Sequence, residues 1–299
     1  MTTRNYRAVV VRRPTDYESL IATHATRGQA EFFLRSRSQS IEEVEREHAV
    51  VQSAIATVLA AIPSRWRRAG IDRSELSRFL FEPDDVVIAV GQDGLVANVA
   101  KYLSGQLVLG VNPLPQRFDG ILVRHPAAAM GDLLADIEAN RPVREHSRAM
   151  VRARLDDGQS LTALNEIFIG HRSHQSARYR IALGDRVERQ SSSGIICCTG
   201  TGATGWASSI HRATGSAIAL PGPTEAKLCF FVREAWPSKF TATGLNCGTL
   251  TEEKRLVVTS ELNQGGVVFG DGIEDDYLSF DWGRIADVGI DERRLHLVG

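Results

Sequence analysis

Apolar and polar residues are distributed in two different ways along this chain. Up to about residue 141, unbroken apolar runs alternate with stretches of helical spacing. Runs rich in Val and Ile predict strands that are buried on both faces, as in a parallel sheet. The predicted strands are 84–90 and 107–111, and the predicted helices are 40–62, 95–104 and one opened by Pro126. The longest helix starts with a capping box of Ser40 and Glu43. This βαβα series predicts an α/β domain with a parallel sheet over residues 1–141.

After Asn140-Arg141-Pro142 the pattern changes to short strands at regular spacing. The predicted strands are 148–155, 162–169, 177–183, 194–198, 227–233, 255–260 and 266–270. Such spacing predicts an antiparallel, β-rich, sandwich-like second domain over residues 142–284. The last strands, near 285–290 and 295–298, fit either domain, and a return of 285–299 to the first domain stays open.

Composition excludes several classes of protein. The 299 residues carry a formal net charge of -1, which gives no reason to expect nucleic acid or an anionic membrane as a partner. No apolar stretch approaches the roughly 18 residues of a membrane span. The segment 1–14 has the pattern of an opening strand, at 6–11, and not that of a signal peptide. We therefore expect a cytoplasmic protein. The cysteines and histidines lack metal-site spacing, and we expect no resident protein-bound metal.

The main candidate for chemistry is Asp93, in the turn Gly91-Gln92-Asp93-Gly94 directly after the run 84–90. Ligands of open α/β sheets bind at the carboxyl ends of the strands, and a helix that starts at such a turn favours phosphate. The alternative is an ordinary strand-to-helix turn with a solvated carboxylate, and on these residues alone the two stand about even.

Other polar residues stand in apolar surroundings. Asn165 and Glu166 interrupt the predicted strand 161–169, which is an expensive place for a carboxylate unless it binds something, although a polar strand edge explains it equally well. The segment 199–205, Thr-Gly-Thr-Gly-Ala-Thr-Gly, follows a strand and precedes a helix from Trp206. It matches a dinucleotide-binding fingerprint by letter, but glycines and prolines interrupt the unit that such a site requires, so we favour a nucleotide contact of another kind. Asp271 begins a charged turn, and such a turn is more often exposed to solvent than part of a binding site.

Taken in order, these segments resemble the NAD kinases, and most closely the type found in mitochondria and some bacteria. The turn 91–94 resembles the family's Gly-Gly-Asp-Gly, and Gly110-Val111-Asn112 resembles the start of its Gly-Val-Asn-Thr segment. The segment 163–170 resembles the family's Asn-Glu strand, and 192–206 its Ser-Ser-Gly and Thr-Gly-Thr-Gly segments. The resemblance runs from about residue 80 to the C-terminus.

The resemblance implies transfer of the γ-phosphoryl group of ATP, with Mg²⁺, to the 2'-hydroxyl of the adenosine ribose of NAD or NADH. Asp93 would be the general base. The residues implied in nucleotide binding are Gly91, Gln92, Gly94, Asn112, Asn165, Glu166, Thr199, Thr201, Gly202, Trp206 and Asp271. The resemblance also implies a nucleotide-binding α/β domain, an NAD-binding β-rich domain, a cleft between them, and a homodimer.

Three departures fall on the phosphate side of this pattern. Gln92 replaces a glycine, Leu95 replaces a threonine, and Pro113-Leu114 replaces Thr-Asp. Two other functions therefore stay open. The first is an enzyme that phosphorylates a ribose hydroxyl of another nucleoside or nucleotide, and the second is a non-catalytic sensor of NAD(P).

Overall fold

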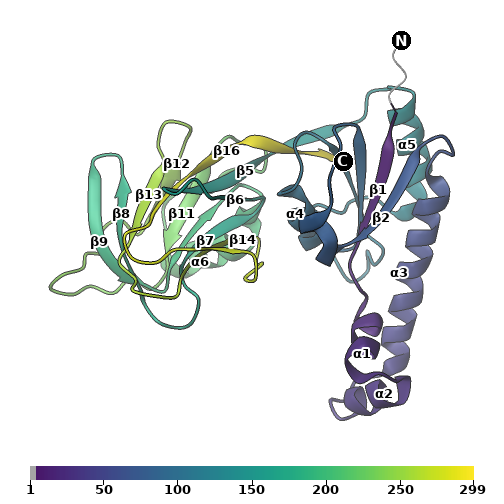
Figure 1. Cartoon of the computed structure of the whole chain (residues 1–299), viewed down its shortest axis with the longest axis horizontal. Helices are drawn as coiled ribbons and strands as arrows, with labels where there is room; N and C mark the ends of the chain where they lie inside the picture. The colour runs from purple at the N-terminus through teal and green to yellow at the C-terminus, as the bar shows by residue number, and fades with distance from the viewer. Residues whose placement is uncertain (1–4) are drawn as a thin grey trace. The chain divides into compact units, whose positions relative to one another are not determined.

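The computed structural model describes residues 5–299, which form two compact units (Figure 1). The first unit is Met1–His146 with His296–Gly299, and the second is Ser147–Leu295. The first strand is Arg7–Arg12, close to the predicted 6–11. Residues 1–4 of the predicted opening segment lie outside the described residues.

A parallel sheet forms the centre of the first unit. Its strands are β1 (Arg7–Arg12), β2 (Arg67–Asp72), β3 (Asp85–Val90) and β4 (Leu107–Val111), in the order β2-β1-β3-β4. The last residues of β16 (Ile285–Val298) pair in parallel with β4, from His296 to Val298. Every residue of β3 is buried, which explains why its sequence has no polar alternation.

Helices cover both faces of this sheet. They are α1 (Asp16–His24), α2 (Arg27–Arg35), α3 (Ile41–Ala61), α4 (Asp93–Ala100) and α5 (Met130–Glu138), with short 3₁₀ turns η1 (Arg73–Arg78) and η2 (Ala127–Ala129). The apolar stripes of α3 and α5 form one core with alternate residues of β1 and β3, and α4 lies on the opposite face (Figure 1). Figure 1 also shows α1 and α2 beside one end of α3.

The structure corrects some details of the helix predictions. The predicted helix 40–62 is confirmed as α3, and the hydroxyl of Ser40 accepts the Glu43 N–H at 3.4 Å. The other half of the predicted capping box, in which the Glu43 carboxylate accepts the Ser40 N–H, is not found among the described residues, and the Ser40 hydroxyl donates to Glu42 at 2.6 Å. The predicted helix 95–104 starts two residues earlier, at Asp93, and ends at Ala100.

The second unit consists of antiparallel strands in two sheets. The first sheet contains β5 (Glu145–Leu155), β6 (Ser160–Ala163), β8 (Ala177–Leu183), β9 (Arg186–Ser192), β13 (Leu256–Ser260) and part of β16. The second contains β7 (Glu166–His171), β10 (Ile195–Cys198), β11 (Leu228–Val232), β12 (Cys247–Leu250), β14 (Gly266–Gly270) and β15 (Tyr277–Ser279). Their facing residues share one apolar core, and this unit also carries η3 (Gly202–Thr204) and α6 (Trp206–Thr214). The predicted fold class, a parallel α/β part and an antiparallel β-rich part, is confirmed.

Two strand predictions were wrong in their boundaries. The predicted single strand 161–169 is two strands, β6 and β7, and the chain breaks between them at Leu164 and Asn165. In contrast, the two strands predicted near 285–290 and 295–298 are one strand, β16. The break matters for function because Asn165 lies in it.

Within the described range, 5–299, no helix combines the length and the apolar character that crossing a membrane requires.

Prediction for the sheet. Arg7 holds Asp85 at the start of β3 with two hydrogen bonds, 2.7 and 2.6 Å long, and the Asp85 side chain is fully buried. Asp85→Ala leaves the Arg7 guanidinium without this partner, so we expect a loss of about 3 kcal/mol in the free energy of unfolding. Urea denaturation measures the loss. The matched control is Asp84→Ala at the exposed neighbour, and equal stability of the two variants would contradict the assignment.

Candidate functional site

Asp93 lies at the carboxyl end of β3, in the first turn of α4, where the sequence predicted chemistry. Its Oδ1 accepts the N–H groups of Leu122 and Val123 at 2.7 and 3.1 Å, and its Oδ2 accepts the N–H of Ile121 at 3.0 Å. A carboxylate offers about four lone-pair positions, so about one position is left for a further donor. The group is therefore fixed in orientation and can still accept a proton from a hydroxyl.

The residues on either side of Asp93 form the turn. Gly91 donates its N–H to Val111 O at 3.0 Å, which joins the turn to the end of β4. Gln92 is the N-cap residue of α4, but its side chain makes no capping bond, and Gly94 is exposed. The first N–H groups of α4 are consequently not capped by a side chain.

Asn112 follows β4 and makes hydrogen bonds within the next loop. Its side chain donates to Phe118 O at 2.9 Å and accepts the Leu114 N–H at 3.0 Å, and it is only 7% exposed. Its own N–H donates to His125 O. Asn112 therefore holds the loop 113–118 in this structure, and its role in nucleotide binding stays a prediction.

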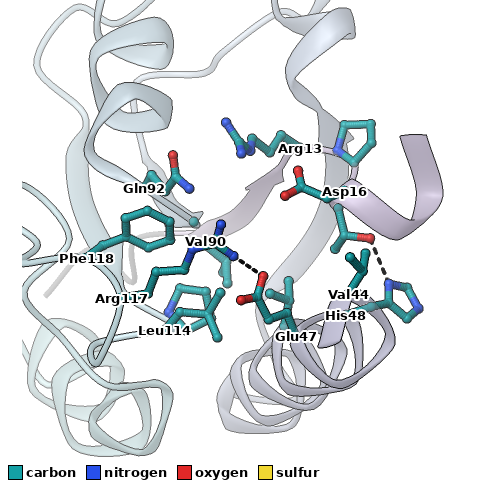
Figure 2. A pocket seen from close by; sticks show the side chains of 15 residues that line it. Arg13, Asp16, Val44, Glu47, His48, Val90, Gln92, Leu114, Arg117 and Phe118 are labelled. Atoms are coloured by element: carbon teal, nitrogen blue, oxygen red, sulfur yellow. Dashed lines mark hydrogen bonds and ion pairs between the residues drawn. The ribbon is translucent and has the colours of Figure 1, made fainter. Parts of the chain in front are cut away.

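A pocket opens in the first unit at the carboxyl ends of β1 and β3 (Figure 2). It contains about 550 Å³ of empty space, which includes open solvent. The polar side chains that line it are Arg13, Thr15, Asp16, Glu47, His48, Gln92 and Arg117. The apolar side chains are Pro14, Val44, Val51, Val90, Pro113, Leu114 and Phe118. Gly91 and Gln92 thus belong both to this wall and to the turn that carries Asp93.

The second group of predicted site residues lies in the second unit, around the break between β6 and β7. The Asp271 carboxylate accepts the N–H groups of Leu164 and Asn165 at 2.9 and 2.7 Å. Asp271 adopts a positive φ of 52°, a conformation that Asp tolerates better than most residues. From the other side, Thr199 donates its N–H to Asn165 O at 2.9 Å and its hydroxyl to Leu164 O at 2.6 Å. The two residues in the break are therefore held on both sides.

The loop from Thr199 to Gly202 packs directly against this break. The Thr199 hydroxyl also accepts the N–H groups of Thr201 and Gly202, at 3.1 and 3.2 Å. A Cβ atom at Gly202 would lie 2.2 Å from Asn165 O, so only glycine permits this approach. The Thr201 hydroxyl accepts a hydrogen bond of 3.3 Å from the guanidinium of Arg148, a buried residue of β5.

The carboxyl group of Glu166 has a raised pKa. Burial, followed by the negative charge of Asp271, raises the pKa of Glu166 to about 7. No hydrogen bond to this carboxyl group is found between residues 5 and 299, so nothing within that range offsets the cost of burying its charge. The group therefore changes charge near neutral pH.

Trp206 begins α6 and is 38% exposed. Its ring stacks on Phe168 with 6.1 Å between centroids, and the Arg233 guanidinium lies 5.0 Å from its centre. Its contacts are thus with β7 and with the end of β11.

The predicted site residues gather in two groups, one in each unit. Gly91, Gln92, Asp93, Gly94 and Asn112 form the first, and Asn165, Glu166, Thr199, Thr201, Gly202 and Asp271 form the second, with Trp206 on α6. Arg13 and Arg117, which line the pocket, were not among the residues that the sequence predicted for the site. A signal for Arg13 existed, because it follows the buried run Val9-Val10-Val11 as Asp93 follows β3.

Comparisons with known proteins point to one group of relatives. No family model matches the chain. It is 32% identical to rat "NAD kinase 2, mitochondrial" and 30% identical to the human protein of that name. Each match covers 45% of this chain, and the chain spans less than half of those proteins, 42% and 40%.

Solved structures agree over almost the whole chain. A crystal structure of yeast NADH kinase complexed with NADH matches with a TM-score of 0.60 and 14% identity, over 99% of this chain and 84% of that one. An NAD kinase from Archaeoglobus fulgidus in complex with ATP gives a TM-score of 0.56 and 17% identity, over 98% and 93%. The chain has the fold of the NAD kinases. The mitochondrial and bacterial subtype stays a prediction.

Prediction for Glu166. Within this NAD kinase fold, Glu166 keeps its proton up to about pH 7, whereas in the unfolded chain it loses the proton near its ordinary pKa of 4.5. Between these values the folded chain binds one proton more, so this residue lowers stability as pH rises, and the loss is complete above about pH 7. Glu166→Gln removes the loss. We expect the variant to gain about 1–3 kcal/mol over the wild type between pH 4.5 and pH 8, measured by urea denaturation at each pH.

The Glu166→Asp variant is the matched control because it keeps an ionisable group. A stability difference between Glu166→Gln and the wild type that is constant over this pH range would contradict the raised pKa.

Prediction for Thr199. The Thr199 side chain is fully buried and its hydroxyl makes three hydrogen bonds. Thr199→Val removes the hydroxyl and leaves buried backbone groups unsatisfied, so we expect a loss of about 2–3 kcal/mol in unfolding free energy. Thr199→Ser keeps the hydroxyl and serves as the control, with an expected loss below about 1 kcal/mol. Equal losses in the two variants, measured by urea denaturation, would show that the hydroxyl does not hold the loop.

Proposed function

We propose that this protein is an NAD kinase of the mitochondrial and bacterial subtype. In this proposal it transfers the γ-phosphoryl group of ATP, which enters with Mg²⁺ as part of the substrate, to the 2'-hydroxyl of the adenosine ribose of NAD or NADH. The observation that carries the proposal is the Asp93 carboxylate, fixed by three backbone N–H groups at the end of a buried parallel strand. The fold and the named relatives support the choice of reaction.

Asp93 acts as the general base in this proposal. Its remaining lone-pair position accepts the proton of the 2'-hydroxyl while the hydroxyl oxygen forms a bond to the γ-phosphorus. The bond between the γ-phosphorus and the bridging oxygen breaks, and ADP leaves with that oxygen. The three amide donors contribute by holding the carboxylate in one orientation, so that no rotation is needed during the reaction.

The second group of residues would bind the acceptor. Asn165, in the break between β6 and β7, has its backbone fixed by Asp271 and Thr199, which leaves its side-chain amide available to an adenine or ribose group. Glu166 in its ionised form would accept hydrogen bonds from ribose hydroxyls. Because its pKa is raised to about 7, acceptor binding through this carboxylate strengthens as pH rises through 7.

Mg²⁺ does not need a protein cage in this scheme. Among residues 5–299 no group of three or more His, Cys, Asp or Glu side chains is arranged to hold a metal ion. Proteins commonly bind Mg²⁺ with one or two carboxylates together with substrate phosphates, and Asp16 in the pocket wall fits that donor set.

A second candidate is phosphorylation of a ribose hydroxyl of another nucleoside or nucleotide. Leu114 and Phe118 give the pocket wall an apolar loop where the resemblance led us to expect a Thr-Asp pair. Leu95 is 2% exposed and packs beneath Gly91, and as a leucine it supplies no hydroxyl at the helix start.

The proposal also includes assembly as a homodimer and a cytoplasmic location. Light scattering of the purified chain tests whether it forms a homodimer.

Prediction for activity. Purified protein is incubated with ATP, Mg²⁺ and a panel of NAD, NADH, adenosine and simple nucleotides, and products are separated by mass spectrometry. We expect a phosphorylated NAD or NADH product. Asp93→Asn should lower its rate by about 10²-fold or more, because the amide cannot accept the hydroxyl proton.

Asp93→Asn also replaces an oxygen that accepts backbone N–H groups, so its thermal unfolding must be measured beside its rate. Asp119→Asn is the control, because Asp119 is exposed, lies just before the loop 121–123 in the chain and accepts none of the three N–H groups that bond to Asp93. Phosphorylation of another panel member would favour the second candidate, and nucleotide binding with no product would favour a sensor.

A further inference from the structure

We propose that the pocket at the carboxyl ends of β1 and β3 binds the phosphate groups of the phosphoryl donor through the guanidinium groups of Arg13 and Arg117. The ligand class is a nucleoside triphosphate with its bound Mg²⁺. This inference rests on the proposed function and deepens it by assigning side-chain cations to the donor's phosphates.

Arg13 is the first reason. It follows β1 directly, it is half-buried, and it lines the pocket (Figure 2). Between residues 5 and 299 the structure gives it no hydrogen bond or ion pair, whereas the preceding Arg12 pairs with Glu18 at 3.1 Å. A partly desolvated guanidinium without a carboxylate partner is well suited to an anion from outside the chain.

Arg117 is the second reason. It reaches the same pocket from the loop 113–118, and Figure 2 shows it opposite Arg13 and paired with Glu47 of α3. The side chains of both partners are substantially exposed, 51% and 36%, and exposed ion pairs contribute little. A triphosphate carries several negative charges and accepts two hydrogen bonds from one guanidinium, so it competes successfully with Glu47.

The position of the pocket connects these arginines to the chemistry. Gly91 and Gln92 form part of its wall, and Gln92 is the N-cap of α4 without a side-chain cap. A phosphate between the two arginines therefore lies beside the uncapped N–H groups of an eight-residue helix, which attract anions. Asp93 is the first residue of that helix and follows the pocket-lining Gln92 directly, which sets the candidate base next to the proposed phosphate site.

The arginines also account for the departures from the family pattern. Gln92 and Leu95 remove a glycine and a hydroxyl from the turn where the family's backbone and threonine face phosphate. In this chain two guanidinium groups, from the end of β1 and from the loop after β4, supply hydrogen-bond donors to phosphate in their place. The carboxylate of Asp16 in the same wall opposes a bare anion and suits one that carries Mg²⁺, whereas Glu47 is paired with Arg117.

The test uses the full chain and inorganic tripolyphosphate with Mg²⁺ as the probe, at fixed ionic strength, with affinity measured by isothermal titration calorimetry. We expect Arg13→Gln and Arg117→Gln each to weaken binding by about 5- to 20-fold. Glu47→Gln should strengthen binding by about two- to fivefold, because it frees Arg117. The opposite signs at Glu47 and Arg117 are specific to this proposal.

The controls carry the same change of charge outside the pocket. Arg12→Gln alters the neighbouring residue, and Arg141→Gln removes an exposed ion pair with Asp136. Both should change the affinity by less than about twofold. Thermal unfolding of every variant shows whether the fold is kept, and Arg13→Gln should unfold like the wild type because its guanidinium has no bonding partner within residues 5–299.

The proposal is overturned if both pocket arginine variants bind tripolyphosphate as the wild type does. It is also overturned if these variants bind adenosine more weakly than the wild type but bind tripolyphosphate equally well, since the pocket would then hold a nucleoside. Failure of the proposed function is seen separately. If Arg13→Gln loses tripolyphosphate binding but the wild type phosphorylates no NAD, the phosphate site is supported and the kinase function is rejected. If the wild type and both variants phosphorylate NAD with the same KM for ATP, the kinase function is supported and the phosphate site is rejected.

Discussion

The candidate site in the first unit depends on three hydrogen bonds, in which the Asp93 carboxylate accepts backbone N–H groups. They join the end of β3 to the loop 121–123, and so they fix the turn that starts α4. The same turn forms part of the pocket wall. A partly buried carboxylate at the end of a parallel strand would be costly without such donors, and with them it becomes a rigid acceptor. Structure and proposed chemistry therefore use the same group.

A comparable constraint organises the second unit. Asp271 and Thr199 bond to the two residues at the break between β6 and β7, one from each side, and Gly202 allows the following loop to lie against Asn165. Glu166 comes next in the chain and remains without a hydrogen bond to its carboxyl within residues 5–299. The fold thus uses its polar groups to fix backbone around Asn165, and it leaves one ionisable carboxyl whose charge changes near pH 7.

The sequence predicted those parts of the fold that depend on local pattern. The strands β3 and β4 were found because both faces are buried, and α3 because its apolar stripe is long. The strand β9 was missed, because its sequence RVERQSS is largely polar and its position comes from pairing with β8. The pairing of Asp93 with residues about thirty positions away, and the convergence of Arg13 and Arg117 on one pocket, arise only in the folded chain. The roles of the site residues stay predictions.

The central claim is that the 2'-hydroxyl of NAD receives the γ-phosphoryl group of ATP in a reaction that Asp93 assists. It is tested most directly by following ATP, Mg²⁺ and NAD with the purified chain by ³¹P NMR, beside an NAD analogue that lacks the 2'-hydroxyl. The account predicts that ADP and a new phosphomonoester appear in equal amounts with NAD, and that neither appears with the analogue. Formation of ADP at the same rate with both dinucleotides, or no phosphomonoester with NAD, would contradict it.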